Sequence, residues 1–353
     1  MTEYGKLTYP EISEQNEALQ AAWEELNKQL EWVNGYFANP AYKEVIFIGS
    51  GSSYYQAQIM ASAFRKWLGR SAIAMPSSEI MLFRENVSSS PDKKLLVGVS
   101  RSGESSEVIL ALESVKSLPE WDICGVTCHA DSKMAQISPC LVSPKGAEKS
   151  TVMTKSFSSM TYMILAAIAL ASSNEEYKKQ VEAALSAQAP VVKAADAFAK
   201  SFVDQHDVFV NYIYLGMGPL FGVAEEAGLK IKEMANVWTE SYGTLEFRHG
   251  PKSIIVDGSL VILLLSEAAR AHELKVGQEM QGYGAKVLVV TTEKGEDTAF
   301  ADYVFEIGGK DLSDDARSVL CLPLLQYLGF YTALKKGVNP DQPRNLTQVV
   351  KID

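Results

Sequence analysis

The sequence predicts an α/β protein made of two tandem domains, each a doubly wound parallel sheet flanked by helices. The chain has 353 residues, more than the roughly 100 to 200 residues of an ordinary domain. Short apolar runs alternate with helical stretches, which is typical of buried parallel strands joined by helices. The order of strand, glycine turn and helix occurs near Val45 and again near Val208, and this repetition indicates two domains of one kind.

The first domain is expected to follow a helical arm. Apolar residues at helical spacing from Leu19 to Trp32 predict this arm over residues 1–40, and the domain itself is expected over residues 41–173. Its strands are expected at 45–48, 72–75, 94–99, 123–127 and 141–142, and its helices at 54–68, 104–115 and 154–171.

The second domain is expected to repeat the same pattern after a connector. Residues 174–205 are rich in Ala and Lys and predict a helical connector, after which the domain covers residues 206–336. Its strands are expected at 208–215, 261–265, 287–291 and 303–307, and its helices at 220–235, 273–282 and 316–335. Residues 337–353 are left as a C-terminal tail.

Composition narrows the classes of function. The net charge is −10 and no cluster of Lys and Arg follows the chain, so nucleic acid is not an expected partner. No apolar run approaches the roughly 20 residues that cross a bilayer, so no membrane is expected. Four scattered cysteines and the lack of a basic, apolar leader indicate the cytoplasm. Cys124, Cys128 and His129 lie on an expected strand with a spacing that favours core over metal ligand, so no metal site is expected.

Two serine-rich loops follow predicted strands of the first domain. Helices begin at these loops, and a helix N-terminus with glycine and hydroxyl groups beside it is a ready site for a phosphate. Either loop alone reads equally well as an ordinary turn with an N-cap, but two in one sheet favour phosphate. A dinucleotide is disfavoured because Tyr54 stands where its fingerprint requires a small residue. The candidate phosphate-binding residues are Gly51, Ser52, Ser53, Ser100, Arg101, Ser102 and Ser105.

The second domain carries polar residues of a different kind. Glu226, Lys230 and Glu233 recur at three- and four-residue spacing and therefore share one face of a helix. His249, in the run Arg248-His249-Gly250-Pro251, is one of four histidines. Taken by themselves, the three helical residues are interpreted as a solvent-exposed helix face with salt bridges, and the histidine is interpreted as a turn residue.

These segments, together with the C-terminal run 341–346 (Asp-Gln-Pro-Arg-Asn-Leu), closely resemble the isomerase half of glucosamine-6-phosphate synthase. That half consists of two SIS (sugar isomerase) domains, so the resemblance implies two tandem SIS domains with flavodoxin-like sheets. It implies that Ser53, Ser100, Arg101, Ser102 and Ser105 match the positions that hold the sugar phosphate. The residue at Arg101 is usually Gln in that family. The tail is implied to close the active site.

The resemblance also implies roles for the second domain. Glu233 matches the carboxylate that moves a proton between sugar carbons, and Lys230 matches a lysine beside it. His249 matches a ring-opening histidine that reaches in from the partner subunit, which implies a homodimer with shared active sites. Glu226 and Glu148 match further carboxylates of the site. The chemistry so implied needs no cofactor.

The sequence departs from that family at three points. It shows no glutaminase domain, so glutamine-dependent synthesis is not expected. Gln348 stands where the family has the lysine that attacks the ketose carbonyl, with Lys351 as an alternative amine nearby. Met153 stands where the family tends to have a serine near the phosphate.

We therefore expect an enzyme that binds a sugar 6-phosphate and carries out acid/base chemistry at C1 and C2. Deamination or deglycation of an amino-sugar or Amadori 6-phosphate is the first expectation, because the shorter two-domain relatives of the synthase include such enzymes. Plain aldose/ketose isomerisation is the close alternative, since it uses the same acid/base pair. A non-catalytic sugar-phosphate sensor is a third reading, and the joint presence of Glu233, Lys230 and His249 argues against it.

Overall fold

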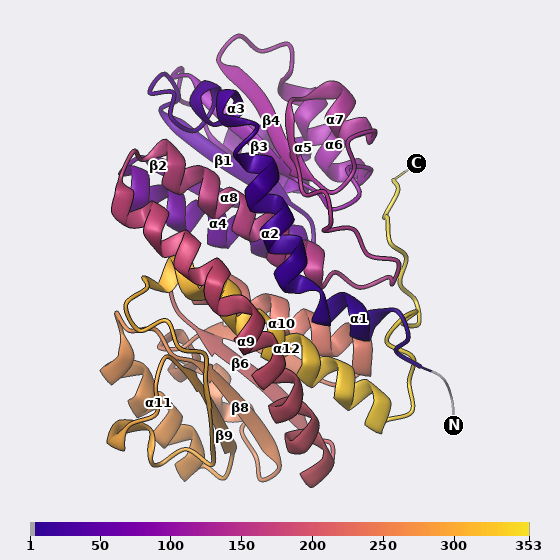
Figure 1. The fold of residues 1–353 in the computed structure, drawn as a ribbon, viewed down its shortest axis with the longest axis vertical. Coiled ribbons are helices and arrows are strands. Elements are labelled where there is room, and N and C mark those ends of the chain that lie inside the picture. Colours follow the sequence, from indigo (N-terminus) through magenta and orange to yellow (C-terminus); the bar gives the residue numbers. More distant parts are fainter. Residues whose placement is uncertain (1–3, 353) are drawn as a thin grey trace. The chain divides into compact units, whose positions relative to one another are not determined.

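The computed structural model describes residues 4–352, which divide into two compact units (Figure 1). The first unit consists of residues 14–185 together with the C-terminal residues from Thr347. The second unit consists of the N-terminal segment that ends at Ser13 together with Ser186–Leu346. Within residues 4–352, each unit contains one five-stranded parallel sheet.

The sheet of the first unit has the strand order β2-β1-β3-β4-β5, and all of its pairings are parallel. This is the flavodoxin-like order. The strands are β1 (Glu44–Gly49), β2 (Ser71–Pro76), β3 (Lys94–Val99), β4 (Trp121–Thr127) and β5 (Cys140–Val142). The helices are α2 (Gln15–Leu26), α3 (Leu30–Gly35), α4 (Ser52–Leu68), α5 (Ser77–Val87), α6 (Ser106–Val115), α7 (Lys133–Ile137) and α8 (Lys155–Ala171).

Helices cover both faces of this sheet. Successive residues of a strand point to opposite faces, and in these strands the residues on both faces are apolar. Ile46, Ile48 and Leu96 pack with α5, α6 and α7. Phe47 points to the opposite face, where its ring lies 5.9 Å from that of Phe64 on α4. Helix α8 packs beside α4 on this second face.

The sheet of the second unit has the order β10-β9-β8-β6-β7, which is the same order when its strands are counted from β6. Its strands are β6 (Asn211–Gly216), β7 (Thr239–Gly243), β8 (Ser259–Leu264), β9 (Lys286–Thr291) and β10 (Tyr303–Glu306). Its helices are α1 (Thr8–Ser13), α10 (Pro219–Ala235), α11 (Arg270–Gly282) and α12 (Asp314–Lys335), with 3₁₀ turns η1 (Glu246–Arg248), η2 (Pro251–Ile254) and η3 (Glu296–Thr298). Helix α9 (Glu175–Gln205) begins in the first unit and ends in the second.

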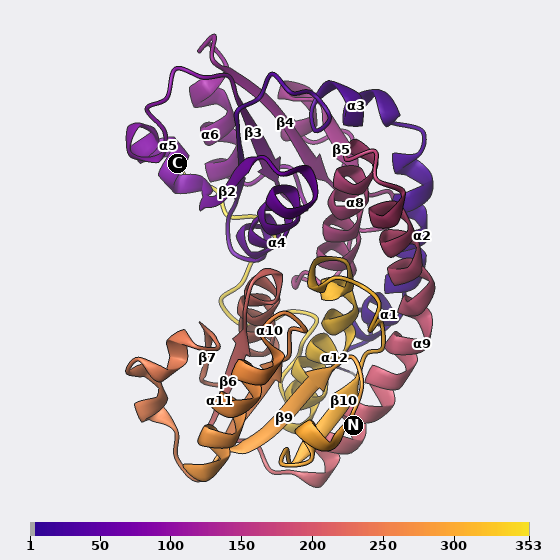
Figure 2. The same cartoon turned by 90° about the vertical axis from the view of Figure 1, so that its left-hand side faces the viewer.

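Helix α11 lies on one face of this sheet, and α10 with α12 lies on the other (Figure 2). Alternation along the strands again explains the two faces, since Ile213, Val261 and Leu263 pack with Leu274 and Met280 of α11. Helices α10 and α12 approach closely because Gly329 has no side chain, and a Cβ there would lie 3.3 Å from the Cα of Ile231.

The repeat extends to the backbone of the first strand–helix turn in each unit. Gly51 and Gly218 precede α4 and α10 with nearly the same dihedrals, φ 57° and ψ −129° against φ 56° and ψ −129°. Only glycine adopts this conformation without strain. Gly49 and Gly216 end the preceding strands where the helix backbone comes close, and a Cβ at Gly49 would lie 2.3 Å from the carbonyl carbon of Ser53.

The predicted fold class of two doubly wound α/β domains is confirmed. The structure adds elements that the sequence did not predict, notably β7 and α5. Helix α6 begins at Ser106, two residues later than expected, and β6 begins at Asn211, three residues later than expected. The predicted arm contains α1, α2 and α3 (Leu30–Gly35), and α1 belongs to the second unit.

Candidate functional site

The two serine-rich loops lie side by side at the carboxyl end of the first sheet. They follow β1 and β3, which are neighbouring strands although β2 lies between them in the sequence. Such a reversal of strand order is where doubly wound sheets bind their ligands. Ser52 and Ser53 form the first turn of α4 and are buried. The structure therefore brings together the hydroxyl groups and helix N-termini that the sequence singled out.

The second loop is shaped by its own serine side chains. The Ser100 hydroxyl accepts a hydrogen bond from the backbone N–H of Gly103 at 3.1 Å and lies 3.3 Å from the Ser105 hydroxyl. The Ser102 hydroxyl accepts from the N–H of Glu104 at 3.1 Å. Gly103 has a φ of +64°, which favours glycine, and a Cβ there would lie 2.2 Å from the Ser132 hydroxyl. The loop thus turns tightly into α6, with Ser105 at its N-cap.

Arg101 is buried and is held by three groups of the same unit. Its guanidinium donates to the carbonyl of Thr151 at 3.1 Å and to the carbonyl of Gln348 at 3.2 Å. It also forms an ion pair with Glu148 at 3.4 Å, and both side chains are at most 8% exposed. We call Arg101, Glu148 and Gln348 the tail clasp, because they join the loop after β3 to residues 148–154 and to the C-terminal tail.

Glu148 is fixed from its other side by the start of α8. Its Oε1 accepts from the backbone N–H groups of Thr154 and Ser156, each at 2.7 Å. A carboxylate at this position satisfies free N–H groups and is stabilised by the positive end of the helix dipole. Glu148 therefore connects the first turn of α8 to the guanidinium of Arg101.

Gln348 anchors the tail through its amide. Its Nε2 donates to the carbonyls of Lys149 and Ser150, at 3.2 Å and 2.8 Å. Beyond it, the N–H of Ser106 donates to the carbonyl of Val350 at 3.4 Å. The Ser106 hydroxyl accepts from the N–H of Ile352 at 3.1 Å. The tail thus lies against the first turn of α6, and the side chain at the position of the family's lysine is an amide bound to backbone.

The second unit holds the acidic and basic residues of α10 together. The Lys230 ammonium lies 3.5 Å from a carboxylate oxygen of Glu226 and also contacts the carboxylate of Glu233. Glu226 and Lys230 are each 1% exposed and Glu233 is 17% exposed. The reading of this face as a solvated stripe is therefore wrong. Charges buried this far from water are retained only when they are paired, and such groups are frequent at functional sites.

His249 lies apart from these residues within the chain. Helix α10 starts at the carboxyl end of β6 and runs back toward the amino end of that strand. Strand β7 begins at this amino end, as the pairing of Thr239 with Tyr212 shows. His249 follows the other end of β7, where Gly243 pairs with Gly216. A strand of this length spans roughly 13 Å. The structure brings Glu226, Lys230 and Glu233 together, and among the described residues no hydrogen bond or ion pair joins His249 to them.

Some contacts that organise these residues had no signal in the sequence. The carbonyls of Thr151 and Ser150 hold Arg101 and Gln348, and a backbone group is the same for every residue type. Met153, at the position where the family tends to have a serine, lies in the segment between Glu148 and α8. Lys351 is exposed.

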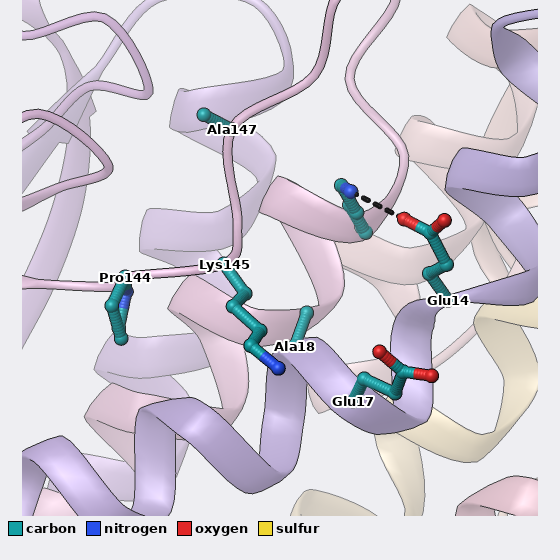
Figure 3. A pocket seen from close by; sticks show the side chains of 7 residues that line it. Glu14, Glu17, Ala18, Pro144, Lys145 and Ala147 are labelled. Atoms are coloured by element: carbon teal, nitrogen blue, oxygen red, sulfur yellow. Dashed lines mark hydrogen bonds and ion pairs between the residues drawn. The ribbon is translucent and has the colours of Figure 1, made fainter.

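A separate hollow lies in the first unit and contains none of the predicted site residues (Figure 3). It is formed by α2, by the segment 144–147 and by the start of α8. Lys155 forms an ion pair with Glu14 at 2.7 Å there, and Lys145 extends toward α2. The lining residues are Glu14, Glu17, Ala18, Pro144, Lys145, Ala147 and Lys155.

Across residues 4–352, no group of three or more His, Cys, Asp or Glu side chains is arranged to hold a metal ion. Burial raises the pKa of the Cys124 and Cys128 thiols well above the ordinary value, so both remain protonated. None of the helices in the described part of the chain combines the length and apolar character needed to cross a membrane.

The two sheets of identical strand order, with serine-rich loops at the reversal point of the first, define a tandem doubly wound α/β protein. The model of the SIS domain family matches residues 41–170 and 211–310, well over half of the chain, and the chain belongs to this family. Each match falls on one of the two sheets.

Known proteins that are similar to this chain include the following three. Glutamine–fructose-6-phosphate aminotransferase [isomerizing] of Brucella melitensis is 27% identical over 86% of this chain, which spans 51% of that relative's length. The solved glucosamine-6-phosphate deaminase of Thermotoga maritima is 26% identical, with a TM-score of 0.74 and coverage of 94% of this chain and 100% of the other. A solved Clostridium novyi protein, provisionally described as a tagatose-6-phosphate ketose/aldose isomerase, is 26% identical, with a TM-score of 0.88 and coverage of 98% and 93%.

Proposed function

We propose that this protein binds a sugar 6-phosphate and releases an amine from it, by deamination of an amino sugar or deglycation of an Amadori sugar. The observation that carries the proposal is the buried group of Glu226, Lys230 and Glu233 on α10. We expect the bound phosphate group to position the substrate and the carboxylate of Glu233 to transfer the proton. Binding energy from a phosphate remote from the reacting carbon serves to orient that carbon.

Glu233 suits the role of the acid/base because it is the most exposed of the three residues and contacts a cation. In its carboxylate form it removes a proton from the carbon next to a C=O or C=N group. The proton then returns to the neighbouring carbon while a second proton passes from the substrate nitrogen to the carbonyl oxygen, so that the C=O double bond is replaced by a C=N bond. Water adds to this C=N bond, the C–N bond breaks as the C=O bond forms, and ammonia or the free amine leaves carrying both hydrogen atoms of the water.

The amide side chain of Gln348 favours amine release over amine transfer. An amide cannot form the Schiff base that the family's lysine forms with a ketose, and here the amide is occupied by two backbone carbonyls. The full-length similarity to a protein described as a glucosamine-6-phosphate deaminase supports the same reaction class.

Aldose/ketose isomerisation is the second candidate. It requires the same proton transfer between C1 and C2 but no C–N cleavage, so Glu233 serves it equally well. The similarity to the Clostridium novyi protein, with its TM-score of 0.88, favours this candidate.

The test is to incubate the purified protein with hexose 6-phosphates, hexosamine 6-phosphates and 6-phosphorylated Amadori compounds. Amine release and aldose/ketose interconversion are followed together. We expect amine release with a hexose phosphate as the second product. Interconversion alone would identify an isomerase, and saturable binding without turnover would identify a sensor.

The assignment of Glu233 is tested with Glu233→Gln. We expect turnover to fall by roughly 10²- to 10⁴-fold, because the amide cannot take up the proton, while the sugar phosphate still binds. Glu306→Gln, which changes an exposed glutamate at the end of β10, is the matched control and should retain full turnover. Wild-type turnover by Glu233→Gln would refute the assignment.

A further inference from the structure

His249 stands at the junction of two short turns. The 3₁₀ turn η1 ends at Arg248, η2 begins at Pro251, and His249 and Gly250 join them. Gly250 has a φ of +121°, a conformation open to glycine, so the chain bends sharply beside the histidine. Among the described residues, the His249 side chain is exposed and has no hydrogen bond or ion pair of its own. Its direction is therefore set by the two turns.

One carboxylate on α11 holds both turns. Glu279 Oε2 accepts from Arg248 Nε at 2.8 Å, in η1. Glu279 Oε1 accepts from Lys252 Nζ at 2.6 Å, in η2. The Tyr283 hydroxyl donates to the same Oε1 at 3.0 Å. Arg248 and Lys252 stand on either side of the His249–Gly250 junction, so Glu279 connects the two flanks of the histidine.

This segment is also attached to α11 at a second place. The Thr244 hydroxyl donates to Glu273 Oε1 at 2.9 Å, and Ser266 donates to the other oxygen from its N–H and its hydroxyl, at 2.8 Å and 2.6 Å. Phe247 lies between these attachments and is fully buried. With Thr244 and Phe247 fixed, the part of the segment from Arg248 to Lys252 is held by Glu279 and, at Lys252, by a longer contact of 3.5 Å to the Tyr283 hydroxyl.

We propose that Glu279 is a positioning residue that fixes the direction of His249 by holding Arg248 and Lys252 at once. The proposal rests on the proposed function, in which His249 opens the sugar ring or protonates the substrate. Glu279 does not touch the substrate in this account. A charged acceptor is required, because the carboxylate accepts from three donors with its two oxygens. A neutral amide has only one accepting oxygen.

The experiment compares Glu279→Gln, Glu279→Asp and His249→Ala with a matched control, Glu293→Gln. Glu293 is also a second-unit glutamate paired with a lysine, Lys310, and is not near the turns in sequence. The first readout is independent of activity. The chain has four histidines, so the ring proton signal of His249 is assigned in the proton NMR spectrum as the one lost in His249→Ala.

In Glu279→Gln we expect the His249 signal to shift and broaden, and amide hydrogen exchange across residues 246–254 to accelerate. The control and the wild type should agree. The second readout is steady-state turnover, where kcat should fall roughly tenfold or more with little change in KM, because the histidine is misplaced while phosphate binding is intact. Glu279→Asp keeps the charge and should recover part of kcat.

The outcomes separate the two proposals. An unchanged His249 signal, unchanged exchange and unchanged kcat in Glu279→Gln would overturn the role of Glu279 and leave the proposed function standing. Wild-type turnover in His249→Ala would overturn the use of His249 in the reaction, whatever the NMR signal does. If Glu279→Gln does not fold, Lys252→Gln is used instead. It removes the contact of Glu279 with η2 and is expected to give the same changes with smaller size.

Discussion

Lys230 is almost completely buried, and the two side chains that it pairs with are both carboxylates. An unpaired ammonium in this position would be costly, because burial penalises the charged form. The two carboxylates offset that cost, and the lysine in turn keeps them from repelling each other. Each charge of the group therefore lowers the cost of burying the others.

Lys230→Met tests this dependence. It should lower the free energy of unfolding by about 3–5 kcal/mol, because it leaves two carboxylates next to each other without their cation. Urea unfolding measures the loss. The double variant Glu226→Gln/Lys230→Met removes one of the two charges and should recover part of it. A double variant less stable than Lys230→Met would contradict the explanation.

Among the elements, the C-terminal tail depends on the tail clasp. Glutamine is the residue usual at this position in the family that the sequence resembles. Replacing Arg101 by Gln removes the guanidinium that donates to the carbonyls of Thr151 and Gln348, and with it the charge that pairs with Glu148. We expect Arg101→Gln to cost about 1–3 kcal/mol of stability, because Glu148 stays buried without its cation. Hydrogen exchange should rise in residues 347–352 and 148–154.

Arg65→Gln is the control for this change. Arg65 also donates to a backbone carbonyl of the first unit, that of Ala72 at 2.7 Å, but it does not contact the tail. Its exchange in residues 347–352 should equal that of the wild type. Equal protection of the tail in Arg101→Gln and in the wild type would show that the tail is held by other contacts.

The contact of α11 with the turns around His249 should depend on pH. The hydrogen bond from Lys252 holds the pKa of Glu279 below its ordinary value of 4.5. A carboxylate whose pKa is lowered by folding stabilises the protein above its unfolded pKa, and this stabilisation is lost as the pH falls through the lowered value. The wild type should therefore exceed Glu279→Gln in stability near pH 7, by about 0.5–1 kcal/mol for partly exposed ion pairs.

Urea midpoints measured from pH 7 down to pH 3 check this expectation. The difference between wild type and Glu279→Gln should be constant to about pH 5 and should shrink below it. A difference that grows on acidification would have the wrong sign for a carboxylate with a lowered pKa.

The strands and helices that the sequence predicted are those with a simple hydrophobic pattern. Buried strands such as β3 and β8 are continuous apolar runs, which parallel sheets require. Strand β7 has the sequence TESYG and lies at a sheet edge, so its polar residues gave no strand signal. Helix α5 has a non-helical residue at Phe83 and few buried side chains, which weakens its periodicity.

The candidate site, like the fold, could be predicted only in part from the sequence. The serine loops and the α10 face were found because residue type and spacing determine them. The burial of Lys230 was not predictable, since the same spacing occurs on solvated helices. The partners of Arg101 were equally hidden, because a backbone carbonyl carries no sequence information and Gln348 is distant along the chain.

At the scale of the whole molecule, the two units share a strand order and a glycine geometry but differ in where their polar residues lie. In the first unit the hydroxyl groups follow β1 and β3, at the carboxyl end of the sheet. In the second, the charged residues lie along α10 and the turn after β6 has no hydroxyl groups. One architecture thus carries two arrangements of polar groups, which is expected when function is set by sites and not by fold.

The separation of His249 from Glu233 within the chain leads to a prediction about subunits. We propose a homodimer in which His249 serves the partner's Glu233. Neither Glu233→Gln nor His249→Ala should be active alone. Mixed dimers should regain activity, because one of their two sites combines an intact Glu233 with an intact His249. With random mixing this amounts to about a quarter of wild-type turnover. Mixed dimers without activity would contradict a shared site.

The carboxylate of Asp341 accepts from the N–H of Leu7 at 3.2 Å and from the N–H of Thr8 at 2.8 Å, so it caps α1 across 333 residues. During synthesis on the ribosome, the residues of α1 emerge 333 residues before their cap. At roughly 5–20 residues per second, α1 waits some tens of seconds for its partner. The second unit can therefore be completed only after Asp341 has been translated, whereas β1 to β5, which end at Val142, have emerged long before it.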